Sequence, residues 1–100
     1  MRKTLTIFLA CLLASFSFAS DDDYDHEEVR ALVEAGVILP LEQILERMWE
    51  EHPGRILEVE LEREYGRYVY EIELLDEKGR VWELEYDAAN GEFLEKEREE

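Results

Sequence analysis

The middle of the chain repeats apolar residues at the spacing of one face of an α-helix. Asp25, with Glu28 three positions later, has the pattern of a capping box, which predicts a first helix that begins there and ends at Gly36. A second helix is expected between Pro40, which suits a helix start, and Pro53, which with the following glycine stops it. Its predicted apolar stripe contains Leu41, Ile44, Leu45, Met48 and Trp49.

From Arg55 onward apolar residues alternate with polar ones, which is the pattern of β-strands that bury one face. Leu57, Val59 and Leu61 alternate with glutamates, and the stretch RYVYEIELLD at 67–76 repeats the alternation. A third strand is expected around Trp82, Leu84 and Tyr86, and a short last strand around Phe93 and Leu94. The expected turns are Tyr65-Gly66, DEKG at 76–79 and DAANG at 87–91.

Two helices followed by three or four antiparallel strands predict an α+β domain. Its two N-terminal helices are expected to pack on one face of a three- to four-stranded antiparallel sheet. The predicted domain covers residues 25–95 and follows a flexible acidic lead at 20–24. The charged tail at 96–100 contains no apolar residue, so we expect it to fray.

Residues 1–19 have the pattern of a secretory signal peptide, in which Arg2 and Lys3 precede an apolar run that ends in small residues. The run is shorter than the roughly 20 residues of a membrane-spanning helix, so no membrane span is expected after cleavage. Export to the periplasm is therefore predicted. Lipidation of Cys11, as in a lipoprotein, is disfavoured because it would leave an apolar stretch in the mature chain.

Acidic residues dominate the mature chain, since removal of Arg2 and Lys3 changes the formal net charge from −16 to −18. Such a charge repels nucleic acid and anionic lipid and favours cationic partners. Loss of Cys11 leaves no thiol, and the two histidines form no catalytic motif with their neighbours. The sequence therefore predicts that the protein is not an enzyme and needs no cofactor.

Four segments of the chain carry a family resemblance: RALVEAGVILPLEQIL (30–45), PGRILEVELE (53–62), GRYVYEIELLD (66–76) and DAANG (87–91). Together they resemble a stand-alone PepSY domain, and the YxYEI strand followed by a DAxxG turn is the most specific part. Small exported bacterial proteins of this kind are usually described as periplasmic. The resemblance implies a helical segment packed on an antiparallel sheet.

Domains related to PepSY occur in the propeptides of thermolysin-type metallopeptidases and in membrane proteins. The resemblance therefore implies a module that binds or inhibits peptidases. The peptidase would be a separate partner here, because a chain of this length has no room for a catalytic domain. The family has no catalytic residues to carry over to this sequence.

Glutamates at alternate positions of three predicted strands would lie on one open surface if the strands keep register. Like charges opposite each other destabilise a sheet, and Arg63, Arg67 and Arg80 near the strand ends, or salt, can compensate a merely solvated face. The alternative is a surface that binds a periplasmic protein, a cationic peptide or divalent cations. The candidate partner-binding residues are Glu58, Glu60, Glu62, Glu71, Glu73, Glu83 and Glu85.

A second candidate site is a metal site in the acidic N-terminal segment, formed by Asp23, Asp25 and His26. A solvated helix entry is the commoner role for a histidine in this position. The turn at 87–91 also offers carboxylate and amide oxygens, but Ala89 stands where an EF-hand loop needs a ligand. That departure favours a simple hairpin turn.

The remaining aromatic residues are expected to serve the core rather than a ligand pocket, because they alternate on the apolar side of the strands. They are Tyr68, Tyr70, Trp82 and Tyr86. The sequence thus favours a non-enzymatic periplasmic binding or regulatory module that modulates another protein, such as a peptidase. The alternative is a protein that binds or senses divalent cations with its acidic sheet face.

Overall fold

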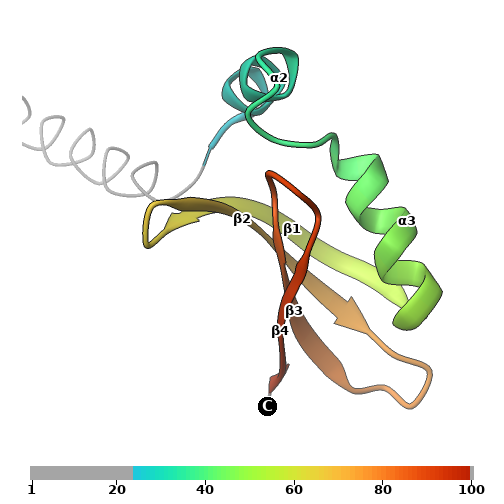
Figure 1. Cartoon of the computed structure of the whole chain (residues 1–100). Helices are drawn as coiled ribbons and strands as arrows, with labels where there is room; N and C mark the ends of the chain where they lie inside the picture. The colour runs from blue at the N-terminus through green and yellow to red at the C-terminus, as the bar shows by residue number, and fades with distance from the viewer. Residues whose placement is uncertain (1–23, 100) are drawn as a thin grey trace, which may run out of the picture.

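The computed structural model describes residues 24–99, which form a four-stranded antiparallel sheet with two helices (Figure 1). This architecture confirms the predicted α+β fold class. The predicted signal peptide, nearly all of the acidic lead, and Asp23 lie outside the described residues. The elements are α2 (His26–Glu34), α3 (Leu41–Glu51), β1 (Arg55–Glu64), β2 (Arg67–Leu75), β3 (Val81–Asp87) and β4 (Phe93–Glu99).

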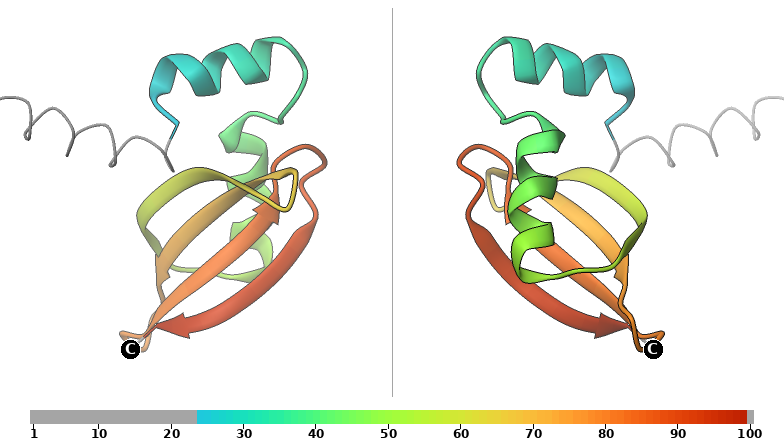
Figure 2. Two further views of the ribbon diagram at one scale, coloured as in Figure 1. Left: turned by 90° about the vertical axis from the view of Figure 1, so that its left-hand side faces the viewer. Right: turned by 90° about the vertical axis from the view of Figure 1, so that its right-hand side faces the viewer.

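Helix α2 begins with the capping box that the sequence predicts. The Asp25 carboxylate accepts the backbone N–H of Glu28 at 2.9 Å, and the Glu28 carboxylate accepts the backbone N–H of Asp25 at 3.0 Å. No residue of α2 is fully buried, and the helix touches the core through Val29, Leu32 and Val33. It lies beyond one end of the sheet rather than across its face (Figures 1 and 2).

Helix α3 lies across one face of the sheet and closes the core (Figure 2). The side chains of Ile44 and Met48 are fully buried, at the spacing of one helical stripe. Trp49, at the edge of this stripe, is 46% exposed, and its indole donates a hydrogen bond to the Gly54 carbonyl. The buried core consists of Ile38, Ile44, Met48, Leu61, Tyr70, Ile72, Leu74, Leu84, Tyr86 and Ala88.

The strands follow each other in the sheet in the order β1-β2-β3-β4, so each strand is joined to the next by a hairpin. Tyr65 and Gly66, between β1 and β2, both have positive φ, 52° and 79°, as a type I′ hairpin turn requires. Short hairpins set the register between neighbouring strands. In this register the core residues Ile72 and Leu84 lie opposite each other in β2 and β3.

Strand β4 continues to Glu99, so the expectation that residues 96–100 fray was wrong for 96–99. Lys96 pairs with Leu84, and Arg98 pairs with Trp82, on the face of the sheet that carries the core. The Lys96 ammonium lies 4.4 Å from the centroid of the Trp82 ring. Cation–π contact and the aliphatic stem of lysine stabilise residues 96–99 of this edge strand, which contain no apolar residue, and hydropathy alone therefore missed them.

The turn between β2 and β3 is organised by the carboxylate of Asp76. It accepts hydrogen bonds from the Trp82 indole at 2.9 Å, from the Arg80 side chain at 3.0 Å, and from the backbone N–H groups of Lys78 and Arg80. The indole hydrogen bond, followed by those from Arg80, holds the pKa of Asp76 well below its usual value. The predicted turn at 76–79 is thereby confirmed, and its last residue, Gly79, has a φ of 81°.

Candidate functional site

The glutamates of the sheet form one continuous surface on the face opposite the core. Glu58 lies opposite Glu73, which lies opposite Glu83, and a second row runs from Glu60 through Glu71 to Glu85. The register on which the candidate surface depends is therefore confirmed. We call this surface the acidic sheet face; it consists of Glu58, Glu60, Glu62, Glu64, Glu71, Glu73, Glu83, Glu85, Glu95, Glu97 and Glu99.

Four members of the acidic sheet face were missing from the sequence-based set. Glu64 continues the alternation of Glu58, Glu60 and Glu62, so the signal was present in the sequence. The other three, at 95, 97 and 99, belong to the part of β4 that was expected to fray. Because β4 pairs with β3, both rows extend by one further glutamate across the sheet.

Mutual repulsion and partial burial raise the pKa values of the central carboxyl groups. Burial, followed by the charges of Glu62 and Glu83, raises the pKa of Glu71 to about 8. Burial, followed by the charges of Glu64 and Glu95, raises the pKa of Glu85 to about 7. Near neutral pH the centre of the face therefore retains protons.

The raised pKa values are accompanied by hydrogen bonds between neighbouring carboxyl groups. Glu71 shares such bonds with Glu62 and Glu83, and each of them requires a proton. A hydrogen bond with Glu99 is the main reason that the pKa of Glu73 is raised, whereas the pKa of Glu62 is raised mainly by burial. The face thus offsets part of its repulsion by protonation.

Two of the three arginines that were expected to compensate the glutamates, Arg63 and Arg80, lie against other groups. The Arg63 guanidinium lies 5.0 Å from the centroid of the Tyr68 ring, on the core side of the sheet. Arg67 lies 3.7 Å from the Asp87 carboxylate, and Arg80 bonds to Asp76. Arg63 and Arg80 therefore do not compensate the acidic sheet face, whereas Arg67 lies opposite Glu64 in the register of β1 and β2 and so belongs to that face.

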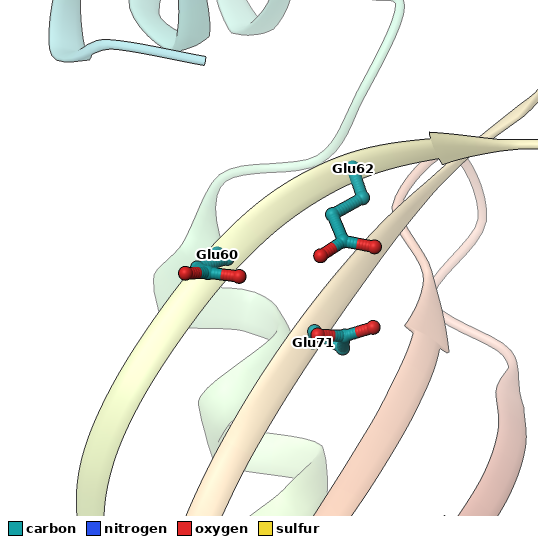
Figure 3. A group of neighbouring side chains, drawn as sticks. All are labelled: Glu60, Glu62 and Glu71. Carbon is teal, nitrogen blue, oxygen red and sulfur yellow. The ribbon is translucent and has the colours of Figure 1, made fainter. Parts of the chain in front are cut away.

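Two groups of three carboxylates within the acidic sheet face have the spacing of a cation site. The first is Glu60, Glu62 and Glu71, and the second is Glu64, Glu71 and Glu85; in each group the ligand oxygens lie within 4.8 Å of one another. Figure 3 shows the first group, in which side chains from β1 and β2 meet. Oxygens that surround one Ca²⁺ at 2.3–2.6 Å have separations of this size. Glu71 belongs to both groups.

The candidate metal residues near the N-terminus lie apart from these groups. The carboxylate of Asp25 caps α2, and His26 is exposed in the first turn of the helix. Asp23 lies outside the described residues, so this metal site stays a prediction. At 87–91 the Asp87 carboxylate accepts the backbone N–H groups of Ala89 and Asn90, which confirms the hairpin interpretation of that turn.

The aromatic residues of the covered face serve the core, as predicted. Tyr70 and Tyr86 are each 2% exposed, and the Tyr70 hydroxyl donates to the Leu39 carbonyl at 2.9 Å. Tyr68 and Trp82 are partly buried against the same cluster. These four side chains therefore belong to the covered side of the sheet, opposite the acidic sheet face.

Fold and site together define a small two-layer α+β domain that presents a sheet of carboxylates on its uncovered side. Among residues 24–99, no helix is long and apolar enough to cross a membrane. The family model described as "PepSY: Peptidase propeptide and YPEB domain" matches residues 38–97. The chain belongs to the PepSY family, since this match spans more than half of its length. Comparison with curated proteins and with solved structures gave no match.

Membership of this family indicates a regulatory or binding module that resembles a peptidase propeptide. PepSY domains are typically non-catalytic and are commonly extracellular or periplasmic. The match begins at Ile38 and so covers α3 and the whole sheet, but not α2. The acidic sheet face lies almost entirely within the matched residues.

Proposed function

We propose that this chain is a non-enzymatic, exported module that binds and regulates another protein, and that its acidic sheet face contacts a cationic surface of that partner. The observation that carries the proposal is the run of glutamates across all four strands. A peptidase is the partner that the family favours. The signal-peptide pattern of residues 1–19 supports a location in the periplasm.

The electrostatics of the face support a cationic partner. The raised pKa of Glu71 reflects its partial burial first and then the charges of Glu62 and Glu83, both of which disfavour the ionised carboxylate. Lysine or arginine side chains placed over the face would stabilise the ionised carboxylates and lower those pKa values. Binding should therefore release protons near neutral pH, and it should weaken as salt screens the charges.

The partner surface can be tested by reversing four charges at the centre of the face: Glu71→Lys, Glu73→Lys, Glu83→Lys and Glu85→Lys. A matched control reverses four glutamates on the helices, namely Glu27, Glu34, Glu46 and Glu50, which are exposed. Crosslinking in a periplasmic extract, followed by quantitative mass spectrometry, should recover the same protein with the wild type and with the control variant. Recovery should fall about tenfold with the face variant.

A peptidase assay tests whether the module regulates the partner that it binds. The wild type and the control variant should change the activity of the captured peptidase, and the face variant should leave it unchanged. Equal capture by all three proteins would reject the acidic sheet face as the partner surface. Capture of a protein whose activity does not respond would reject regulation.

Divalent-cation binding is a second candidate function, because Glu71 links two groups of carboxylates at the spacing of a calcium site. A bound cation would replace the protons that the face holds near neutral pH, so binding should weaken on acidification. In this case the face buffers or senses the ion, and α3 and the core only support the sheet.

Calorimetric titration with CaCl₂ at about pH 8 tests the second candidate, with NaCl of equal ionic strength as reference. We expect saturable heat and a melting temperature that rises beyond the NaCl reference. Glu71→Gln should weaken the response about tenfold because it removes a ligand from both groups, whereas Glu46→Gln on α3 should leave it unchanged. A response that follows ionic strength alone would reject calcium binding.

A further inference from the structure

Strand β1 is an open edge of the sheet with an apolar groove beside it. β1 pairs with β2 on one side, and no described strand pairs with its other side, so alternate backbone N–H and C=O groups face outward. A groove of about 710 Å³ lies between α2, the start of α3 and the covered face of β1. We call it the β1 groove; its apolar lining includes Tyr24, Val29, Val33, Leu41, Val59 and Leu61.

The two faces of β1 differ in chemistry. Val59 and Leu61 point to the covered face and line the β1 groove. Glu58, Glu60 and Glu62 alternate with them and lie on the acidic sheet face. The polar rim of the groove carries more acidic than basic groups. Arg30 stands there with three carboxylates, those of Asp25, Glu42 and Glu60, so the rim also favours a cationic segment.

A strand that pairs with β1 must match both faces at once. Its side chains alternate between the two sides of the sheet, and cross-strand neighbours lie close enough to interact. One set of side chains would extend into the β1 groove and the other would stand beside the glutamates of β1. We infer that the open edge of β1 binds an extended segment of the partner protein, in which apolar residues alternate with lysine or arginine.

The other occupants that this edge could take are opposed by charge. A second copy of the chain, paired through its own β1, would place two columns of glutamates side by side. The opposite edge, β4, carries Lys96 and Arg98 on its covered face, where they lie against Trp82. An inward-pointing lysine disfavours the addition of a strand, so the same peptide should not bind to β4.

This inference rests on the proposed function in one respect, which is that the module binds another protein. The probe is a short peptide of alternating lysine and valine, acetylated and amidated at its ends. Two control peptides keep its charge: one has lysines and valines in separate blocks, and the other is N-methylated at alternate backbone nitrogens. Binding to the full mature protein is measured by calorimetry and by amide hydrogen exchange.

We expect the alternating peptide to slow hydrogen exchange of the β1 amides and to leave β4 unchanged. Both control peptides should bind about tenfold more weakly, because one loses the alternation and the other loses the backbone hydrogen bonds. Equal binding of the three peptides would overturn the inference, since it would show attraction by charge alone. Protection of β4 instead of β1 would also overturn it.

Two variants of equal charge locate the peptide on the protein. Glu58→Gln, Glu60→Gln and Glu62→Gln remove three charges beside the open edge of β1, and Glu95→Gln, Glu97→Gln and Glu99→Gln remove three from β4. The β1 variant should bind the alternating peptide about tenfold more weakly, and the β4 variant should change the affinity less than about threefold. Equal losses in the two variants would overturn the inference.

The outcomes separate this inference from the proposed function. If reversal of the central glutamates abolishes partner capture while the alternating peptide leaves β1 unprotected, the face binds the partner and the edge inference fails. If the central variant captures the same proteins while the peptide protects β1, the edge inference stands and the proposed face fails.

Discussion

Replacement of Leu84 by alanine should lower the free energy of unfolding by about 2–5 kcal/mol. Leu84 is fully buried in β3, opposite Ile72 of β2, and belongs to the core that α3 covers. The truncation removes apolar contact and leaves a cavity that neighbouring strands cannot close without breaking register. A domain of this size has a total stability of about 4–11 kcal/mol, so the substitution should remove a large share of it.

Urea denaturation followed by far-UV circular dichroism and tryptophan fluorescence measures this loss. Leu57→Ala is the matched control, because Leu57 lies in β1 and is 43% exposed. Its effect should stay within about 1 kcal/mol. Equal destabilisation by the two substitutions would contradict the placement of the core under α3.

Acidification from about pH 8 to about pH 5 should stabilise the domain. The pKa of Glu71 is raised to about 8 and that of Glu85 to about 7, so the folded state binds more protons than the unfolded state in this interval. Stability is then greatest at the acidic end and falls as the pH rises through 7 and 8. Both groups are partly exposed, so we discount the gain to about 1 kcal/mol, or about 5 °C in melting temperature.

Below about pH 4 the trend should reverse, because the pKa of Asp76 is lowered by its hydrogen bonds and that stabilisation is lost on protonation. Thermal denaturation across the pH range tests both limbs. Glu71→Gln should raise the melting temperature at pH 8 and flatten the rise toward pH 5, whereas Glu46→Gln on α3 should leave the profile unchanged. A melting temperature that falls steadily from pH 8 to pH 5 would contradict the repulsion on the acidic sheet face.

The two candidate functions of the acidic sheet face predict the same loss of protons but different contacts with the carboxylates. A cationic protein and a divalent cation both displace protons from Glu71, but only the cation requires the oxygens of three carboxylates around one point. A partner protein would contact the rows of glutamates across several strands. Family membership favours the partner protein, because the family indicates a regulatory or binding module.

Local pattern alone specifies most of the fold. The capping residues Asp25 and Glu28 and the change of apolar period at Arg55 are short-range signals, and both elements appear where these signals place them. The same holds for the glutamates at alternate positions of β1 and β2, because alternation within a strand needs only the strand itself. The outward positions of the glutamates within each of these strands follow from this alternation.

Contacts between strands decided what the patterns left open. Residues 96–99 form a strand because they pair with β3 and because Lys96 contacts the Trp82 ring. The sequence of the charged tail contains no pattern that predicts these contacts. The direction of Arg63, and hence its failure to compensate the glutamates, depends on the position of Tyr68 across the hairpin. The raised pKa of Glu71 also depends on tertiary structure, because its burial and its charged neighbours are set by the folded sheet. The groove beside β1 likewise exists only where α2, α3 and β1 come together.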